Sequence, residues 1–407
     1  MAGPITFEMT GGASLVVNGN ATISATITGS AGLNISGAAQ LDLTAAAGNS
    51  YTGGTTINGT VVRLGHDAAL STGTVTINGA ATLASNSGTA RTIANNLALN
   101  ANLTLGQAAG GTGALTFDGT VDLGGNSREL NTLVTTTLNG VVSNGGIDKA
   151  GTDTLILANS GNTYTGATNI NAGVVRVNAA GALGSTSVVT VASGARLELD
   201  GSITVNHSAV INGNGGNYNG AIQSYSGNAV WSGNITLGSD LARVGAGVAG
   251  STLTVSGIID SGVDNFGLAV RSATGSDVVV LSGANTYLGA TQSLVGTLRL
   301  GANNTLPVGT ILQIGNTSDV DSTTVDLDGF NQTIGGLESL GSTMSRTLTN
   351  TSGTASTLTI NSLSDRTYGA TIAGNLSIVK DGSFTQIFTA ANSNSGTTTI
   401  NAGRLEV

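Results

Sequence analysis

The chain of 407 residues has no cysteine, two prolines, and few charged or aromatic residues, which make up 9% and 3% of it. Without cysteine, neither a disulfide nor a thiolate metal site is possible, and the chain suits an oxidising compartment where stray thiols are a liability. The shortage of aromatic residues argues against a typical β-sandwich core, which recruits large rings. These absences favour a fold with a narrow core of small side chains.

Basic residues and long apolar runs are also scarce. The chain has 13 lysines and arginines against 22 acidic residues, a net charge of −9, and no basic stripe. Since nothing in the chain is suited to neutralising phosphates, nucleic acid is not an expected partner. No run of about 18 apolar residues occurs, so we expect no direct membrane insertion by this segment.

Glycine is abundant, at 63 residues, and it separates short segments in which apolar and polar residues alternate. Alternation with a period of two is typical of half-buried strands, as at 74–77 (TVTI), 188–191 (VVTV) and 357–360 (TLTI). Asn-Gly and Asp-Gly pairs between such segments mark turns. No segment has a convincing helical apolar stripe, so the pattern predicts an all-β chain.

One stretch of sequence, here called the repeat block, recurs four times. Its clearest copy reads NTYTGATNINAGVVRV, and the four blocks lie at 49–64, 162–177, 285–300 and 392–407. Self-similarity at a long period signals a repeat architecture, in which each unit stacks on its neighbours. We expect structural roles for the recurring residues of the block, which are Asn49, Tyr51, Gly53, Asn162, Tyr164, Gly166, Asn285, Tyr287, Gly289, Asn392 and Gly396.

Short strands and small side chains favour a parallel β-helix, or solenoid, in which each strand stacks on its equivalent in the next coil at ~4.8 Å. Coils of roughly 20 to 23 residues predict about 18 coils. We expect one continuous array over 1–407, with long repeats at 32–145, 146–266, 267–375 and, in part, 376–407. The competing interpretation is a string of β-sandwich modules, which predicts linkers, but no shift in composition marks one.

Further phrases lie at 148–157 (DKAG followed by TLIL), 220–237 (GAIQSYSGNAVWSGNITL) and 327–337 (LDGFNQTIGGL). Together with the block at 162–177, they resemble the autotransporter-associated β-strand repeat, also called the passenger-associated transport repeat, of bacterial surface proteins. The resemblance implies a right-handed, single-stranded β-helical stalk that is exported, displays or forms an adhesive surface, and lies outside the cell at the bacterial outer-membrane surface.

The chain departs from a whole protein of that kind. Its start, MAGPITFEMTGG, has neither the charged n-region nor the apolar h-region of a signal peptide. It also lacks the C-terminal membrane barrel of an autotransporter. We therefore expect a segment of a larger surface protein.

The function we predict is structural: a non-enzymatic stalk or adhesin segment without a cofactor. One alternative is a self-assembling extracellular filament subunit, because open β-helix ends tend to stack. Another is a polysaccharide-binding or polysaccharide-degrading β-helix. The expected partners are other copies of the chain or adjacent repeats, end to end, and surface glycans.

Catalysis on a β-helix usually needs carboxylates one coil apart on one face. Asp240 with Asp260, and Asp319 with Glu338, have suitable spacing. With 22 acidic residues in the chain, however, some pairs fall near one coil length by chance. We therefore assign no catalytic residue.

Two clusters are candidates for binding. Asp319, Asp321, Asp326 and Asp328 could supply oxygen ligands to Ca²⁺, although they lack the spacing of an EF-hand loop. Tyr218, Tyr225 and Trp231 could form a binding surface, or a satellite cluster of the core. For the tyrosine of the repeat block, we favour a structural ring packed over the following glycine instead of a sugar-stacking ring.

Overall fold

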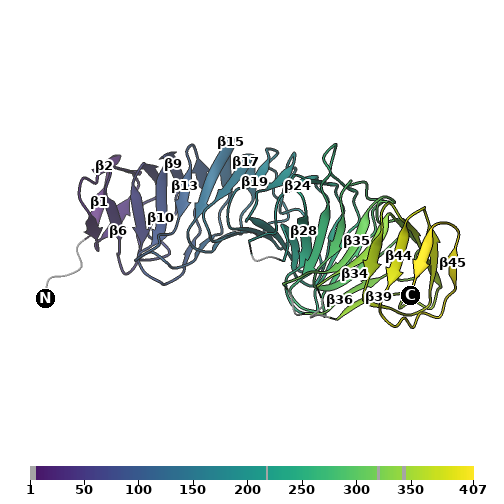
Figure 1. Cartoon of the computed structure of the whole chain (residues 1–407). Helices are drawn as coiled ribbons and strands as arrows, with labels where there is room; N and C mark the ends of the chain where they lie inside the picture. Colours follow the sequence, from purple (N-terminus) through teal and green to yellow (C-terminus); the bar gives the residue numbers. More distant parts are fainter. Residues whose placement is uncertain (1–5, 217–218, 319–320, 342–344) are drawn as a thin grey trace. The chain divides into compact units, whose positions relative to one another are not determined.

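The computed structural model describes residues 6–216, 219–318, 321–341 and 345–407. Within these ranges the chain is all-β, without a helix, and its parallel strands stack as a β-solenoid of about 19 turns (Figure 1). The predicted fold class is therefore confirmed, and about 19 turns agree with the predicted number of about 18 coils. No helix that could cross a membrane is found in the described residues.

The strands fall into two compact units, Met1–Val189 and Thr190–Val407. Our prediction of one continuous array over 1–407 stays a prediction. Unit 1 contains the strands β1 (Thr6–Met9), β2 (Ala13–Val16), β3 (Ala21–Ile23), β4 (Thr26–Gly29), β5 (Leu33–Ser36), β6 (Gln40–Leu43), β7 (Thr55–Asn58), β8 (Val61–Leu64), β9 (Val75–Gly79), β10 (Ala81–Ser85), β11 (Arg91–Ile93), β12 (Leu97–Leu99), β13 (Leu103–Leu105), β14 (Leu115–Phe117), β15 (Val121–Thr132), β16 (Thr136–Leu138), β17 (Val142–Ala150), β18 (Thr154–Leu157), β19 (Thr168–Ile170) and β20 (Val174–Val177).

In the second half of the chain, β21 (Val189–Val191) contains the boundary between the units. The strands that follow are β22 (Arg196–Asp200), β23 (Thr204–Val205), β24 (Ala209–Ile211), β25 (Ile222–Ser226), β26 (Asn228–Trp231), β27 (Ile235–Leu237), β28 (Ala242–Ala246), β29 (Thr252–Val255), β30 (Ile259–Asp260), β31 (Leu268–Ser272), β32 (Val278–Leu281), β33 (Thr291–Ser293), β34 (Gly296–Leu300), β35 (Ile311–Gly315), β36 (Thr323–Asp326), β37 (Gln332–Ile334), β38 (Gly336–Leu340), β39 (Arg346–Thr349), β40 (Ser356–Asn361), β41 (Arg366–Tyr368), β42 (Thr371–Ile372), β43 (Leu376–Asp381), β44 (Thr385–Phe388), β45 (Thr398–Ile400) and β46 (Arg404–Glu406).

Apolar columns run through the core of unit 1. Ile35, Ile57, Ile77 and Leu99 are register partners in succession, and all four are fully buried. Their spacing gives coils of 22, 20 and 22 residues (57 − 35, 77 − 57 and 99 − 77). The residues between them on each strand point outward. Because side chains on a strand alternate between its two faces, the apolar residues of successive coils stack into a buried column at each inward position.

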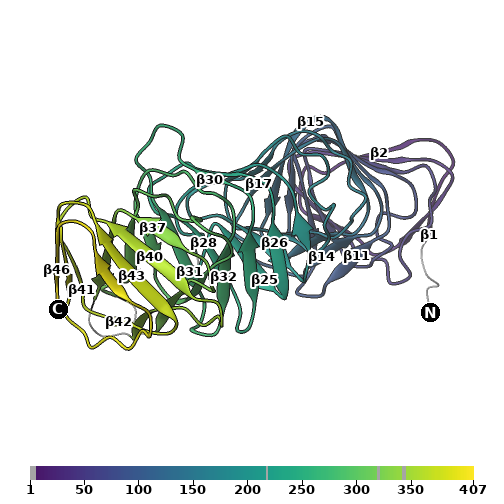
Figure 2. The same ribbon diagram turned by 90° about the vertical axis from the view of Figure 1, so that its right-hand side faces the viewer.

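Unit 2 is built in the same way, and β25, β28 and β31 show the stacking clearly (Figure 2). Its coil length varies more than we predicted. A buried column runs through Leu253, Val279, Leu298, Val325 and Leu348, with steps of 26, 19, 27 and 23 residues (279 − 253, 298 − 279, 325 − 298 and 348 − 325). The extra residues lie in loops between strands, where they leave the stacking unchanged.

Candidate functional site

The asparagine of the repeat block links three consecutive coils. Asn162 is buried; its Oδ1 accepts a hydrogen bond from the Val142 N–H at 2.8 Å, and its Nδ2 donates to the Ala182 carbonyl at 2.7 Å. Both partners are 20 residues away, one in the coil before and one in the coil after. The equivalent bonds are Asn49 with Ile27 N–H and the Ala69 carbonyl, Asn285 with Ile259 N–H and the Thr305 carbonyl, and Asn392 with Ile372 N–H.

The tyrosine of the block fills the core beside this asparagine. Tyr51, Tyr164 and Tyr287 are at most 1% exposed, and each hydroxyl bonds to the threonine four residues later. The distance between the hydroxyl oxygens is 3.1 Å for Tyr164 and Thr168. Burial raises the pKa of all three hydroxyls, to about 12 for Tyr51. These rings have no exposed face on which a sugar could stack.

The glycine of the block lies directly against the backbone of the preceding coil. A Cβ at Gly53, Gly166 or Gly289 would come closer than 3.0 Å to backbone atoms of a glycine there, which is Gly32, Gly146 or Gly267 respectively. No larger residue fits at these corners without a shift of the backbone. The block is therefore a structural corner in which asparagine, tyrosine and glycine hold successive coils together.

Two buried lysines, which we did not predict from the sequence, each bind three backbone carbonyls of two successive coils. Lys149 is fully buried, and its Nζ donates to the carbonyls of Ala150, Gly151 and Ala172 at 2.7, 2.9 and 3.0 Å. Burial lowers the pKa of this ammonium group to about 8. Three carbonyl acceptors compensate the charged group for part of the water that it loses.

Lys380 repeats this arrangement with the carbonyls of Asp381, Gly382 and Ala402, and burial lowers its pKa as well. A signal was present in the sequence. Both lysines of the chain stand two residues before a glycine and one coil before the phrase Ile-Asn-Ala-Gly. In the other two blocks, which lack that phrase, the residues at the same register position are Ile35 and Val270.

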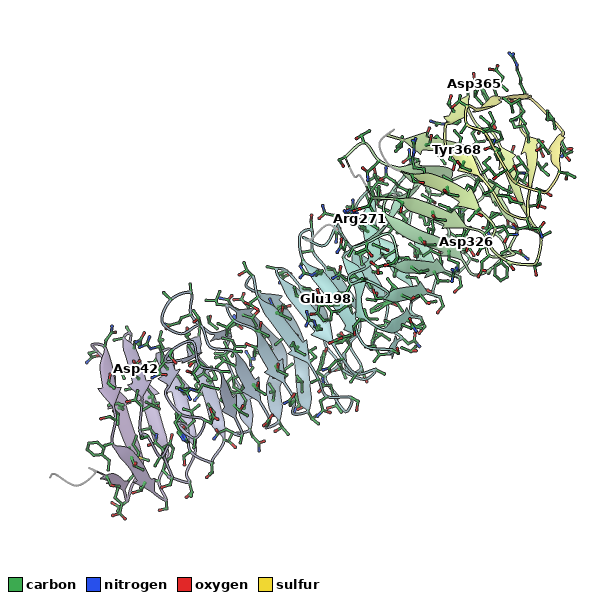
Figure 3. The ribbon with its side chains drawn as sticks, turned by 90° about the horizontal axis from the view of Figure 1, so that it is seen from below. Asp42, Glu198, Arg271, Asp326, Asp365 and Tyr368 are labelled. Atoms are coloured by element: carbon green, nitrogen blue, oxygen red, sulfur yellow. The ribbon has the colours of Figure 1, made fainter. Side chains whose placement is uncertain are left out.

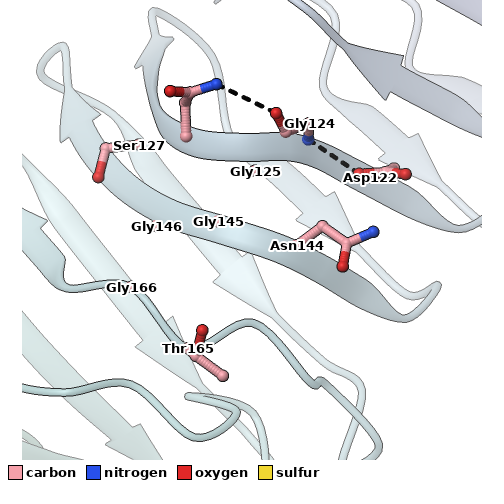
Figure 4. Close-up of a pocket in the computed structure, with 10 residues that line it drawn as sticks. Asp122, Gly124, Gly125, Ser127, Asn144, Gly145, Gly146, Thr165 and Gly166 are labelled. Carbon is pink, nitrogen blue, oxygen red and sulfur yellow. Dashed lines mark hydrogen bonds between the residues drawn. The ribbon is translucent and has the colours of Figure 1, made fainter.

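An open hollow of about 660 Å³ lies beside the corner of the second block (Figure 4). It forms because β15 shifts register against β17 between Asp122 and Asn126, where Gly124 and Gly125 have φ of 65° and 77°. The ten lining residues come from three successive coils: Asp122, Gly124, Gly125, Asn126, Ser127, Asn144, Gly145, Gly146, Thr165 and Gly166. A hollow of about 350 Å³ lies at the corresponding corner of the first block, around Gly32 and Gly53.

The predicted calcium cluster is not assembled in the described part of the chain. Asp319 lies outside the described residues. Asp326 is buried (Figure 3), and its carboxylate accepts hydrogen bonds from the Thr351 N–H at 3.0 Å and hydroxyl at 2.6 Å. Asp326 and Asp328 also face Arg299, at 3.5 and 3.9 Å. Among the described residues, which include Asp321, no three His, Cys, Asp or Glu side chains gather as metal ligands.

Of the two interpretations of the aromatic cluster, a binding surface or a satellite cluster of the core, Trp231 fits the core. Tyr218 lies outside the described residues, and Tyr225 is half-buried on β25. Trp231 is fully buried, because it faces inward on β26 between the register partners Val205 and Val255. Its indole is part of the core and offers no surface to a ligand.

The carboxylates that we considered for catalysis are held apart or occupied. Asp260 pairs in register with Thr236, whereas Asp240 accepts a hydrogen bond from the Gly267 N–H at 2.8 Å, so the two carboxylates do not stack. Glu338 accepts hydrogen bonds from Gln313 at 2.7 Å and Arg366 at 2.8 Å. Since Asp319 lies outside the described residues, that pair has no described geometry.

Comparison with known proteins gives two matches. The passenger-associated-transport-repeat matches at 33–62, 147–177, 273–292 and 378–407. An adhesin of Brucella suis biovar 1 (strain 1330), the BmaC autotransporter, is 32% identical over 160 residues, which are 39% of this chain and 4% of that protein. The chain thus spans a small part of this relative's length. No solved structure matches the chain.

Each of the four matched segments contains the asparagine and the glycine that form the corner. The passenger-associated-transport-repeat, the family that the sequence resembles, thus matches the chain at all four of its repeat blocks.

Proposed function

We propose that the chain is a surface-exposed passenger segment of an autotransporter-like protein, in which it acts as a non-enzymatic stalk and adhesive surface. One observation carries this proposal: each of the four matched segments contains the corner of one repeat block, where a block asparagine bonds to the preceding coil. The similarity to an autotransporter adhesin supports the same role.

The corners suggest how the fold would serve export. Asn162 accepts a hydrogen bond through Oδ1 from the coil before it and donates one through Nδ2 to the coil after it. Each folded coil therefore presents bonding groups and a buried face for the next one. In repeat proteins, structure nucleates locally and propagates between neighbours. A chain that emerges from a membrane end first could fold coil by coil, and the free energy of each added coil would favour outward movement.

Of the two carboxylate pairs considered from the sequence, Asp240 with Asp260 does not support the enzymatic alternative, because these two carboxylates do not stack. Asp240 and Asp260 bond to backbone or hydroxyl groups of different elements, and Glu338 is engaged by Gln313 and Arg366. Two further predictions from the sequence remain proposals: end-to-end association with other copies of the chain and contact with surface glycans.

The test is to fuse the whole chain between a signal peptide and an autotransporter translocator in a laboratory Gram-negative host. Protease accessibility on intact cells measures export, and adherence to cultured epithelial cells measures adhesion. We expect the chain to be displayed, and displayed cells to adhere more than cells that carry the translocator alone. Display without increased adherence would refute the adhesive role but keep the stalk, whereas retention inside the cell would refute the passenger role.

A further inference from the structure

The hollow beside the second repeat block has polar side chains at its rim and glycines at its floor (Figure 4). Asp122 and Ser127 stand on β15, Asn144 on β17, and Thr165 on the corner that follows, so that three successive coils contribute. Gly125, Gly145 and Gly166 lie between them. A ligand in the hollow would meet backbone below and polar groups around it.

Much of the hydrogen-bonding capacity of the rim is unused. Within the described part of the chain, the side chains of Ser127, Asn144 and Thr165 make no hydrogen bond to another protein group. Asp122 uses Oδ1 to accept from the Gly124 N–H at 2.8 Å, which leaves Oδ2 for a ligand. The rim thus offers one carboxylate oxygen, one amide and two hydroxyls.

At two glycines of the floor, the close packing of neighbouring coils leaves no room for a side chain. A Cβ at Gly145 or Gly166 would come closer than 3.0 Å to atoms of neighbouring coils. Gly125 is different, because a Cβ there would have nothing within 4 Å. A side chain at this position would enter open space at the hollow without disturbing the coils below.

The lining excludes several classes of ligand. The ten lining residues include no lysine or arginine to bind phosphate or sulfate, and no large apolar side chain to bind a lipid. The Arg128 guanidinium lies beside Gly124 but is not part of the lining, and its Nε donates to the Leu99 and Leu123 carbonyls. A single carboxylate is a poor site for a divalent cation. Addition of a peptide strand is blocked as well, because β15 and β17 are paired on both sides.

A ligand that carries several hydroxyl groups matches the rim, since each hydroxyl can donate a hydrogen bond to the carboxylate and accept one from the amide or a hydroxyl. We propose that this hollow binds a short stretch of an uncharged glycan. The proposal rests on the function proposed above and names the class of ligand that the adhesive surface would recognise. The smaller hollow at the first block differs, because Asn34 at its rim already accepts a hydrogen bond from Asn58 at 2.6 Å, and the proposal is confined to the second block.

The experiment uses the purified whole chain and three neutral probes: maltohexaose, cellohexaose and N-acetylchitohexaose. Saturation-transfer NMR and calorimetry measure binding, with heparin as the polyanionic comparison. We expect at least one neutral probe to bind with a Kd on the order of 1 mM, as befits a few hydrogen bonds in an open site. Thr165→Val, which removes one exposed hydroxyl, should weaken binding a few-fold.

Gly125→Asn is the decisive variant, because asparagine tolerates the φ of 77° and would add bulk at a residue that lines the hollow. Gly59→Asn is the matched control: Gly59 has a φ of 71°, and the nearest atom to its Cβ position is 3.8 Å away. Binding should fall at least tenfold in Gly125→Asn, stay unchanged in Gly59→Asn, and both variants should keep the β-sheet circular dichroism of the parent.

No binding by any neutral probe at about 10 mM would overturn the proposal, as would equal binding by Gly125→Asn or binding to heparin alone. These binding results can be distinguished from a failure of the proposed adhesive function, which is tested by the adherence of cells. Cells that adhere while the purified chain ignores all three probes would remove the glycan site and leave the adhesin standing.

Discussion

Replacing Asn162 with alanine tests the corner most directly. The change removes two buried hydrogen bonds and leaves the Val142 N–H and the Ala182 carbonyl without their partner. A buried polar group left unsatisfied costs about 1–3 kcal/mol, so the two together should lower the local free energy of unfolding by about 2–6 kcal/mol. The loss should be largest in the coils that contain these two groups.

Asn159→Ala is the matched control. Asn159 also makes two hydrogen bonds through its side chain, to the Asn139 carbonyl at 2.7 Å and from the Gly161 N–H at 2.8 Å, but both are exposed to water. Because water replaces the lost partner there, this change should cost only about 0.5–1 kcal/mol. The comparison separates the effect of burial from the number of bonds.

Native-state hydrogen exchange followed by NMR is the suitable assay, since a repeat array does not unfold in one step and a single unfolding free energy is not defined for it. A loss of about 2–6 kcal/mol corresponds to exchange that is roughly 30-fold to 20,000-fold faster, at about 1.4 kcal/mol per factor of ten. Equal acceleration in Asn159→Ala and Asn162→Ala, or no acceleration near Val142, would refute the reasoning.

Three further predictions concern unit 1. Lys149→Met should lower the local free energy of unfolding of the coils around it by about 2–4 kcal/mol in the same hydrogen-exchange experiment, because three carbonyls lose an ammonium donor. Burial lowers the pKa of Lys149 from 10.5 to about 8, so between these pH values the unfolded chain holds more protons than the folded chain. The stability of the parent should therefore rise with pH across this window, more than that of Lys149→Met. Equal dependence of stability on pH in the parent and in Lys149→Met would contradict this. Gly166→Ala should lower the local free energy of unfolding by about 1–3 kcal/mol through overpacking, whereas Gly88→Ala, whose nearest contact is 3.6 Å away, should be nearly neutral in the same hydrogen-exchange experiment.

The architecture was predictable because each coil repeats one simple pattern. Alternation in segments such as 74–77 placed Val75 and Ile77 inside, and both are buried in the structure. The spacing of Tyr51 and Tyr164 showed that one unit recurs along the chain. Periodicity is a local property of the sequence, so it carries over to the fold without knowledge of distant contacts.

The buried lysines could not be predicted in this way. Lys149 is satisfied by carbonyls of its own turn and of Ala172, 23 residues away (172 − 149), and this cage exists only after two coils have stacked. For Trp231 the sequence left both a binding surface and the core open, because a strand of four residues gives too little alternation to show which face is inside. The hollow at Asp122 arises from a register shift, which no local pattern announced.

The measurement that tests the central claim most directly is the adherence of cells that display the whole chain on an autotransporter translocator. Protease accessibility first establishes that the displayed chain and the translocator alone reach the surface in equal amounts. If the chain is a passenger segment with an adhesive surface, displayed cells adhere more strongly than the translocator control, and soluble chain competes for the same sites. Equal adherence, or failure of the chain to reach the surface at all, would contradict the account.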